Sequence, residues 1–153
     1  MSYNSILEAI KTNSEINPGK LCVGDKKNKA TYGQFWKMIN KGAAYLEKNG
    51  VKKGDVVVLR GAQKVEYLFS IFSIQLLGAI ACPLEKAVKE DRILEIMNFV
   101  ETKYFLDTKK LKDTSAECIS LKEMFKEAMN DETECDVNKY ELPKSDDLSE
   151  ILF

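Results

Sequence analysis

The sequence predicts an α/β fold, a mostly parallel sheet with helices on both faces. Residues 64–84 are the first indication, because they read as a helix with almost no polar face, a glycine, and then a strand. A helix that is apolar nearly all round must be covered by other elements. Residues 56–59 form an uninterrupted apolar run, typical of a strand buried on both faces. Helix and strand patterns then alternate through residues 104–107, as in a parallel α/β core.

Residues 1–30 are expected to form a short helix and a hairpin. The helix would begin after a polar cap at Asn4 or Ser5 and end at the turn of residues 17–19. Its apolar positions are Ile6, Leu7 and Ile10. Residues 21–23 then read as a strand, and residues 25–28 as the turn that reverses it.

Residues 31–107 are expected to form the β-α-β core, led by an amphipathic helix. Thr31 and Gln34 have the spacing of a capping box, in which each side chain satisfies a backbone donor at a helix start. The apolar face is made by Tyr32, Phe35, Trp36, Ile39, Ala43 and Leu46. Lys37, Lys41 and Lys48 fall on the opposite face, and Gly50 closes the helix.

Two strands and two helices follow the first strand of the core. The helix of the central stretch ends at Gly78, where a left-handed residue is expected, and Pro83 is expected to end the next strand by removing a donor. A second helix carries its apolar face on Ile93, Ile96, Met97 and Val100. Residues 104–107 then form the third strand.

Residues 108–147 are expected to add a peripheral helix and an acidic loop. Residues 118–119 read as a short strand and residues 121–129 as a helix, before an acidic stretch without pattern. Residues 148–153 read as a strand with nothing after it. An uncovered apolar strand is an aggregation liability, so we expect the chain to be an incomplete subdomain that can self-associate.

Composition and charge exclude several functional classes. The 23 basic and 24 acidic side chains give a net charge of −1, which supports neither nucleic-acid binding nor attraction to an anionic membrane. The polar residues and the glycine within residues 64–84 argue against a membrane span. The first five residues lack the basic and apolar regions of a signal peptide, which favours the cytoplasm.

The residue types that build catalytic and metal-binding sites are scarce in this chain. The chain has no histidine, so Ser/His and Cys/His arrangements are excluded, and its four cysteines have no metal-binding spacing. Cys22 and Cys82 lie in strand-like runs and are interpreted as small buried hydrophobes. The sequence assigns no catalytic, cofactor-binding or metal-binding residue.

Several segments together resemble the N-terminal region of the adenylate-forming (AMP-binding) enzymes, which include acyl-CoA synthetases, aryl-CoA ligases and nonribosomal peptide adenylation domains. Residues 31–35 (TYGQF) resemble the L-T-Y-x-E-L helix start, and residues 50–57 (GVKKGDVV) the G-V-x-x-G-D-x-V turn. Residues 76–84 (LLGAIACPL) resemble L-x-A-G-A-x-x-x-P-L, and residues 91–93 (DRI) the following E-R-L helix start. Residues 146–153 (DDLSEILF) resemble D-D-x-A-x-I-x-F, the strand that precedes the phosphate-binding loop.

This resemblance implies a parent enzyme that uses Mg-ATP to activate a small-molecule carboxylate as an acyl-adenylate, then passes it to CoA or to carrier-bound pantetheine. The ATP, magnesium and catalytic groups would lie outside this chain, so the 153 residues alone are expected to be inactive. Departures at residues 60–63 and Glu85 lean toward a CoA ligase or a divergent member over an amino-acid adenylation domain.

The alternative is a stand-alone α/β binding or regulatory module. Arg60 and Asp107 follow or end two predicted strands, where ligands commonly sit in open sheets. The more frequent role of such rim charges is an ion pair or a solvated position at the surface.

Overall fold

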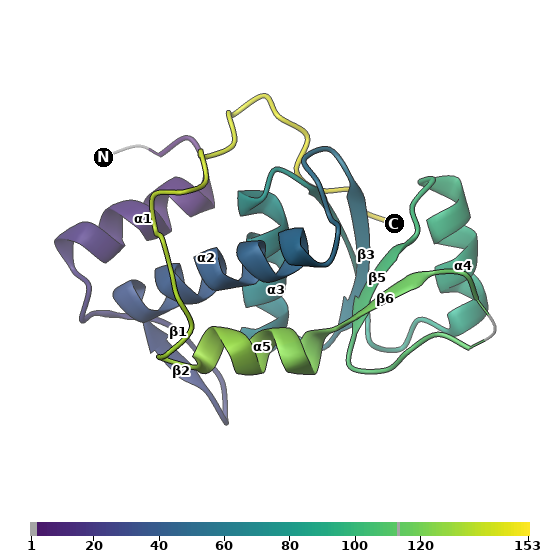
Figure 1. The fold of residues 1–153 in the computed structure, drawn as a ribbon, viewed down its shortest axis with the longest axis horizontal. Coiled ribbons are helices and arrows are strands. Elements are labelled where there is room, and N and C mark those ends of the chain that lie inside the picture. Colours follow the sequence, from purple (N-terminus) through teal and green to yellow (C-terminus); the bar gives the residue numbers. More distant parts are fainter. Residues whose placement is uncertain (1–2, 113) are drawn as a thin grey trace.

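The computed structural model describes residues 3–112 and 114–153, so Met1, Ser2 and Asp113 lie outside the described residues. A four-stranded sheet forms the centre, in the order β4-β3-β5-β6, and every neighbouring pair is parallel. A separate antiparallel hairpin joins β1 and β2. Figure 1 shows helices on both sides of the sheet, as the sequence predicted.

Eleven helices and strands follow one another along the described part of the chain. The strands are β1 (Leu21–Gly24), β2 (Lys29–Thr31), β3 (Val56–Gly61), β4 (Ile80–Glu85), β5 (Tyr104–Asp107) and β6 (Glu117–Ser120). The helices are α1 (Ile6–Ile16), α2 (Tyr32–Lys48), α3 (Val65–Leu76), α4 (Glu90–Phe99) and α5 (Leu121–Met129). No helix among the described residues is long and apolar enough to cross a membrane.

The sheet separates two hydrophobic clusters of unequal size. Val57 and Leu59 point into the larger cluster, which α1, α2, α3 and α5 cover, whereas Val58 points into the smaller one beneath α4. Val58 aligns with Cys82 on β4 and with Phe105 on β5, so one row of side chains crosses three strands. The β-branched run is therefore buried on both faces, as predicted.

The helix α3 is the central helix of the larger layer. It packs against α2, α5 and β4, and Phe69, Ser73 and Ile74 are completely buried. Gly78 follows it with φ of 86°, a left-handed conformation that glycine adopts without a steric penalty. Leu68 remains 37% exposed, so the cover of this helix is incomplete on one side.

The prediction that Pro83 ends a strand is wrong. The strand β4 continues to Glu85, and Pro83 pairs in register with Leu59. The backbone N–H of Ala81 donates to Ser149 on the side away from β3. Because backbone groups two residues apart face the same side of a strand, the nitrogen of Pro83 also faces the outer edge, where no ladder donor is needed.

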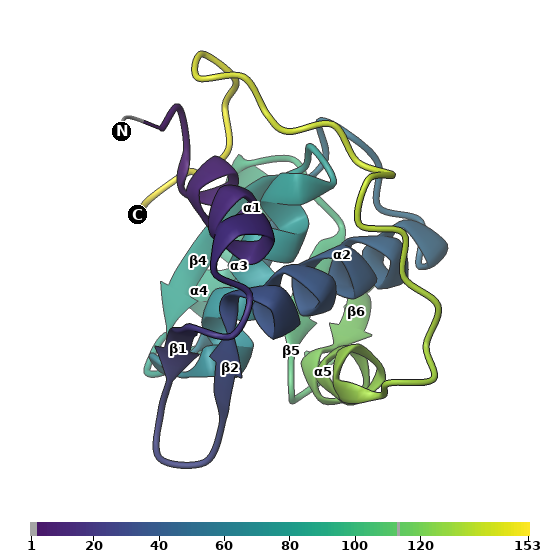
Figure 2. The ribbon, with the colours of Figure 1, turned by 90° about the vertical axis from the view of Figure 1, so that its left-hand side faces the viewer.

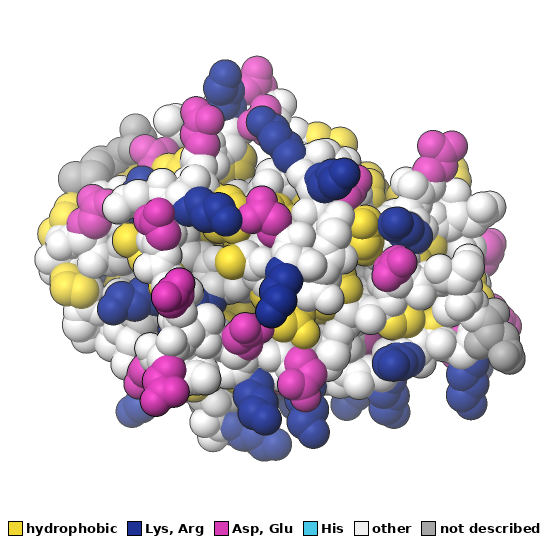
Figure 3. Space-filling model, viewed as in Figure 1, with side chains coloured by type: hydrophobic (Ala, Val, Ile, Leu, Met, Phe, Trp, Pro, Cys, Tyr) yellow, Lys and Arg dark blue, Asp and Glu magenta, His cyan; other side chains and the backbone are white. Residues whose placement is uncertain are grey.

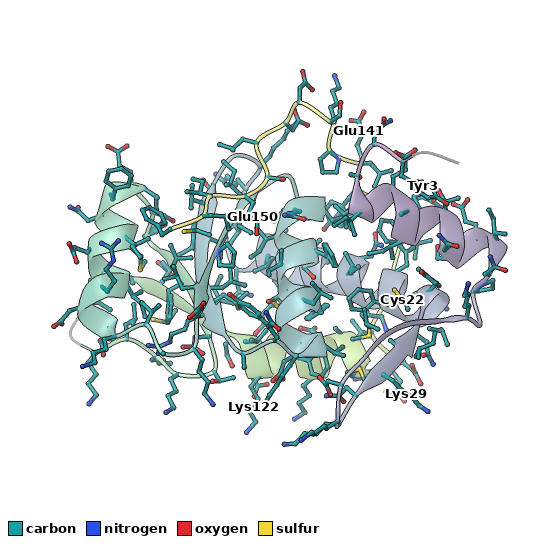
Figure 4. All side chains as sticks on the ribbon, turned by 180° about the vertical axis from the view of Figure 1, so that it is seen from behind. Tyr3, Cys22, Lys29, Lys122, Glu141 and Glu150 are labelled. Carbon is teal, nitrogen blue, oxygen red and sulfur yellow. The ribbon has the colours of Figure 1, made fainter. Side chains whose placement is uncertain are left out.

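Residues 148–153 were predicted to form a strand, but the structure has only one isolated β-bridge there. Glu150 pairs in parallel with Ala81, and Ile151 N–H donates to the Ala81 carbonyl over 2.9 Å. Figure 4 shows Glu150 beside the sheet. The chain then leaves the edge, because Phe153 packs edge-on against Phe99 of α4 at 5.8 Å between ring centroids. Self-association through this segment stays a prediction.

Local capping predictions are confirmed at the first two helices. Ser5 accepts a hydrogen bond from Glu8 N–H at the start of α1. Thr31 and Gln34 form the full capping box of α2, with bonds in both directions. Helix α3 has no cap from its own N-cap side chain, Lys64.

A distant carboxylate takes over that role. Asp25 Oδ2, in the hairpin turn, accepts from Val65 N–H over 2.8 Å, while its Oδ1 accepts from Lys27 and Asn28 N–H. These bonds, led by the one from Val65, hold the pKa of Asp25 below its ordinary value. Asp25 thereby ties the β1–β2 hairpin to the start of the central helix.

Replacing Asp25 by asparagine should make stability less dependent on pH. A carboxylate whose pKa is lowered by folding stabilises the native state above its unfolded pKa, and this contribution disappears as pH falls through the folded pKa. Urea midpoints of the parent chain and Asp25→Asn should therefore differ at pH 7, and the difference should be smaller at pH 3. An unchanged difference between the two midpoints at pH 3 would contradict this assignment.

Candidate functional site

The carboxyl ends of β3 and β5 form the natural place for a site in this sheet. Strand β3 lies between β4 and β5 in the sheet. The chain goes from β3 to β4 on one side and then crosses to β5 on the other side, so the strand order reverses between β3 and β5. Ligands of open α/β sheets bind at such a switch point, beyond the carboxyl ends of the strands. The structure brings Arg60 of β3 and Asp107 of β5 together there.

Arg60 and Asp107 form a largely buried ion pair. Arg60 Nη2 and Nε lie 2.9 and 3.0 Å from Asp107 Oδ2, and their side chains are 17% and 10% exposed. Arg60 Nη1 donates to the Val88 carbonyl over 2.7 Å, and the guanidinium lies 5.9 Å from the Phe105 ring centroid. All three guanidinium nitrogens are therefore engaged, and the pair clamps two strands and the 86–89 loop.

A cavity of about 280 Å³ opens beside this clamp. Lys64, Lys86 and Lys109 contribute exposed positive charges to its lining, and Glu66 contributes a negative one. Tyr67 also lines it and donates its hydroxyl proton to the Leu84 carbonyl. Burial raises the pKa of Tyr67 to about 12, so this phenol stays neutral at physiological pH and cannot act as a base there.

Thiol and metal chemistry find no support in the described residues. Burial raises the pKa of Cys82 to about 11, and it also raises the pKa values of Cys22 and Cys135. Cys82 is fully buried, and Cys22 packs against the larger cluster from the hairpin, where Figure 4 labels it. The interpretation as a buried hydrophobe is confirmed for Cys82, whereas Cys22 is only partly buried. Residues 3–112 and 114–153 contain no cluster of His, Cys, Asp or Glu that could hold a metal ion.

Lys41, predicted to lie on the face opposite the apolar one, is buried. The residue is only 8% exposed, and its Nζ donates to the Asn130 carbonyl at the end of α5 over 2.9 Å. Helical periodicity places a residue on a face but does not reveal what covers that face. Here the contact comes from a residue 89 positions away, so no local signal could have indicated that Lys41 is buried.

The surface charges do not gather into one large patch on the face seen in Figure 3. Acidic and basic side chains are interspersed there, with hydrophobic atoms visible between them. Glu47 and Lys139 form an exposed ion pair, 2.9 Å apart, and the Tyr140 hydroxyl lies 3.1 Å from the same Glu47 oxygen. These contacts fasten the strap, residues 130–149, along helix α2.

Comparisons with known proteins identify a family. A family model described as "AMP-binding enzyme" matches residues 10–153. The nonribosomal peptide synthetase tcpP of Claviceps purpurea is 30% identical over 105 residues, which are 68% of this chain and 5% of that protein. D-alanine--D-alanyl carrier protein ligase of Bacillus licheniformis is 24% identical over 102 residues, which are 67% of this chain and 20% of the ligase.

A solved structure shares the fold. The N-terminal subdomain of Klebsiella oxytoca NpsA, in complex with anthranilyl-AMSN, superposes with a TM-score of 0.81 at 18% identity. The match covers 99% of this chain and 39% of the NpsA chain. The present chain thus spans only a minor part of the relatives that it matches.

Proposed function

The chain belongs to the AMP-binding enzyme family, and from this premise we propose that its residues are the N-terminal scaffold of an ATP-dependent adenylate-forming ligase. The ligase would activate a small-molecule carboxylate as its acyl-adenylate. The family match over residues 10–153 is the observation that carries this proposal. Arg60 and Asp107 serve the scaffold, because their ion pair fixes the geometry of the sheet at its carboxyl edge.

The acceptor of the acyl group would be a thiol. The printed names of the relatives include a carrier protein ligase and a nonribosomal peptide synthetase, and they favour carrier-bound pantetheine over free CoA. The same proposal places the enzyme in the cytoplasm, where ATP and acceptor thiols are available.

The residues present do not fit a complete Mg-ATP site. A loop that wraps phosphates needs glycines so that backbone N–H groups can converge on the anion, and the last glycine of the chain is Gly78. At the carboxyl edge of the sheet, the Arg60 guanidinium is already occupied by Asp107 and Val88. We therefore propose that other polypeptide segments bind ATP and magnesium, and we assign no catalytic step to these 153 residues.

A chimera tests the scaffold role. Residues 1–153 would replace the matching part of the Bacillus licheniformis D-alanine ligase, and ATP–pyrophosphate exchange would be measured with D-alanine. We expect exchange that depends on D-alanine, because the scaffold does not choose the carboxylate. The 153-residue chain alone should give neither exchange nor saturable heat when it is titrated with Mg-ATP.

The control is the same chimera carrying Gly42→Leu, which disrupts the packing of the scaffold. It should lose exchange together with its cooperative thermal transition. A chimera that unfolds cooperatively but gives no exchange would count against the scaffold role. Micromolar binding of Mg-ATP to the isolated chain would show that the nucleotide site has been misplaced.

A further inference from the structure

A second cavity lies away from the sheet edge, where the hairpin meets helices α2 and α5. It measures about 630 Å³, a volume within the range of small-molecule sites. Figure 2 shows the hairpin, the start of α2 and the helix α5 that surround it. Its apolar lining comes from Pro18, Ala30, Trp36, Met38, Ala128 and Val137.

One lysine, Lys41, is largely buried within this apolar lining. Lys41 is 8% exposed, and the Asn130 carbonyl is the one hydrogen-bond partner that its ammonium has among the described residues. An ammonium group has three donors, so two of them are left for other partners. Within residues 3–112 and 114–153, no carboxylate forms an ion pair with Lys41.

The remaining charges around the cavity leave this ammonium uncompensated. Lys29 and Lys37 add two exposed positive charges to the lining, and Glu15 and Asp131 add two exposed negative ones. These four charges lie in contact with solvent, where interactions are screened and weak. A buried charge without an opposite partner is costly, so an anion that enters the cavity would gain from pairing with Lys41.

We propose that this cavity binds a small organic carboxylate with an apolar chain. Its carboxylate would pair with the Lys41 ammonium, and its chain would lie along Trp36, Met38 and Val137. A charge-assisted hydrogen bond supplies the recognition, and the apolar lining supplies hydrophobic burial. The inference rests on this cavity and does not depend on the ligase role proposed above.

Trp36 allows a direct test, because it is the one tryptophan in the sequence and it lines the cavity. Its fluorescence would be followed while the full chain is titrated with octanoate, and separately with octan-1-ol, which has the same chain length but no charge. Octanoate should change the signal in a saturable way and bind about tenfold more tightly than the alcohol. Equal affinities, or no saturable change with octanoate, would overturn the proposal.

Two substitutions of Lys41 and one distant control locate the interaction. Lys41→Met should reduce the affinity for octanoate to that for octanol, whereas Lys41→Arg should keep the preference for the acid. Lys64→Met, which removes an exposed charge outside this cavity, should bind octanoate as the parent chain does. Unchanged octanoate binding by Lys41→Met would overturn the assignment.

The test does not depend on the stability of the methionine variant. If Lys41→Met does not fold, the parent chain is titrated at low and high salt. An octanoate preference carried by a charge pair should fall as salt rises, while octanol binding should not weaken. A preference that is independent of salt would contradict a charge pair at this site.

Discussion

Replacing Gly42 by alanine should lower the free energy of unfolding by about 3 kcal/mol. A Cβ atom at this position would lie 2.1 Å from Ser73 Oγ and 2.7 Å from Phe69 Cε2. Ser73 and Phe69 belong to α3 and are fully buried, so neither can move away without disturbing the larger cluster. The substitution would force α2 and α3 apart.

Whether Gly42→Ala lowers or raises the free energy of unfolding distinguishes the effect of this close contact from the effect of helix propensity. Gly42 lies within helix α2, and alanine in a helix interior is favoured over glycine by about 1 kcal/mol. Propensity alone therefore predicts stabilisation, whereas the close approach predicts a large loss. Urea unfolding followed by circular dichroism gives the difference directly. Gly19→Ala is the matched control, because no atom lies within 4 Å of its added Cβ, and its effect should stay within about 0.5 kcal/mol.

Local patterns in the sequence predicted most of the secondary structure. The capping box at Thr31, the apolar periodicity of α2 and the β-branched start of β3 each act over a few residues, and each is confirmed. The close approach of α3 to Gly42 was not predicted, because the residues around a helical glycine do not indicate which other element packs against it. Pro83 was misread because the edge position of β4 depends on strand order.

The candidate site was predicted only in part. The ends of two strands correctly indicated that Arg60 and Asp107 lie at the carboxyl edge, and an ion pair was one of the two roles expected for such rim charges. The burial of Lys41 was missed, because Asn130, to which its ammonium donates, lies 89 residues away in the sequence. Residues close in sequence reveal periodicity, while burial of a charge depends on segments that meet only in the folded chain.

Replacing Asp107 by alanine should destabilise the fold by about 2 to 3 kcal/mol. The substitution leaves the Arg60 guanidinium, 17% exposed, without its carboxylate between β3 and β5. Removing one partner of a largely buried pair costs more than the pair contributes, because the other charge remains in the protein. The exposed pair Arg92–Glu95, 3.6 Å apart, gives the control, and Glu95→Ala should change stability by no more than about 0.5 kcal/mol.

A double-mutant cycle shows whether the two charges act as a unit. Arg60→Met alone removes the bonds to Asp107 and Val88, but Asp107 keeps the bonds donated by Thr108 N–H and Oγ1–H. Arg60→Met should therefore destabilise the fold less than Asp107→Ala does. The loss of stability in the double variant should be smaller than the sum of the two single losses, by at least about 1 kcal/mol. Additive losses in urea unfolding would mean that the two side chains stabilise the sheet independently. A coupled loss would identify the pair as the clamp that holds the carboxyl edge of the scaffold in shape.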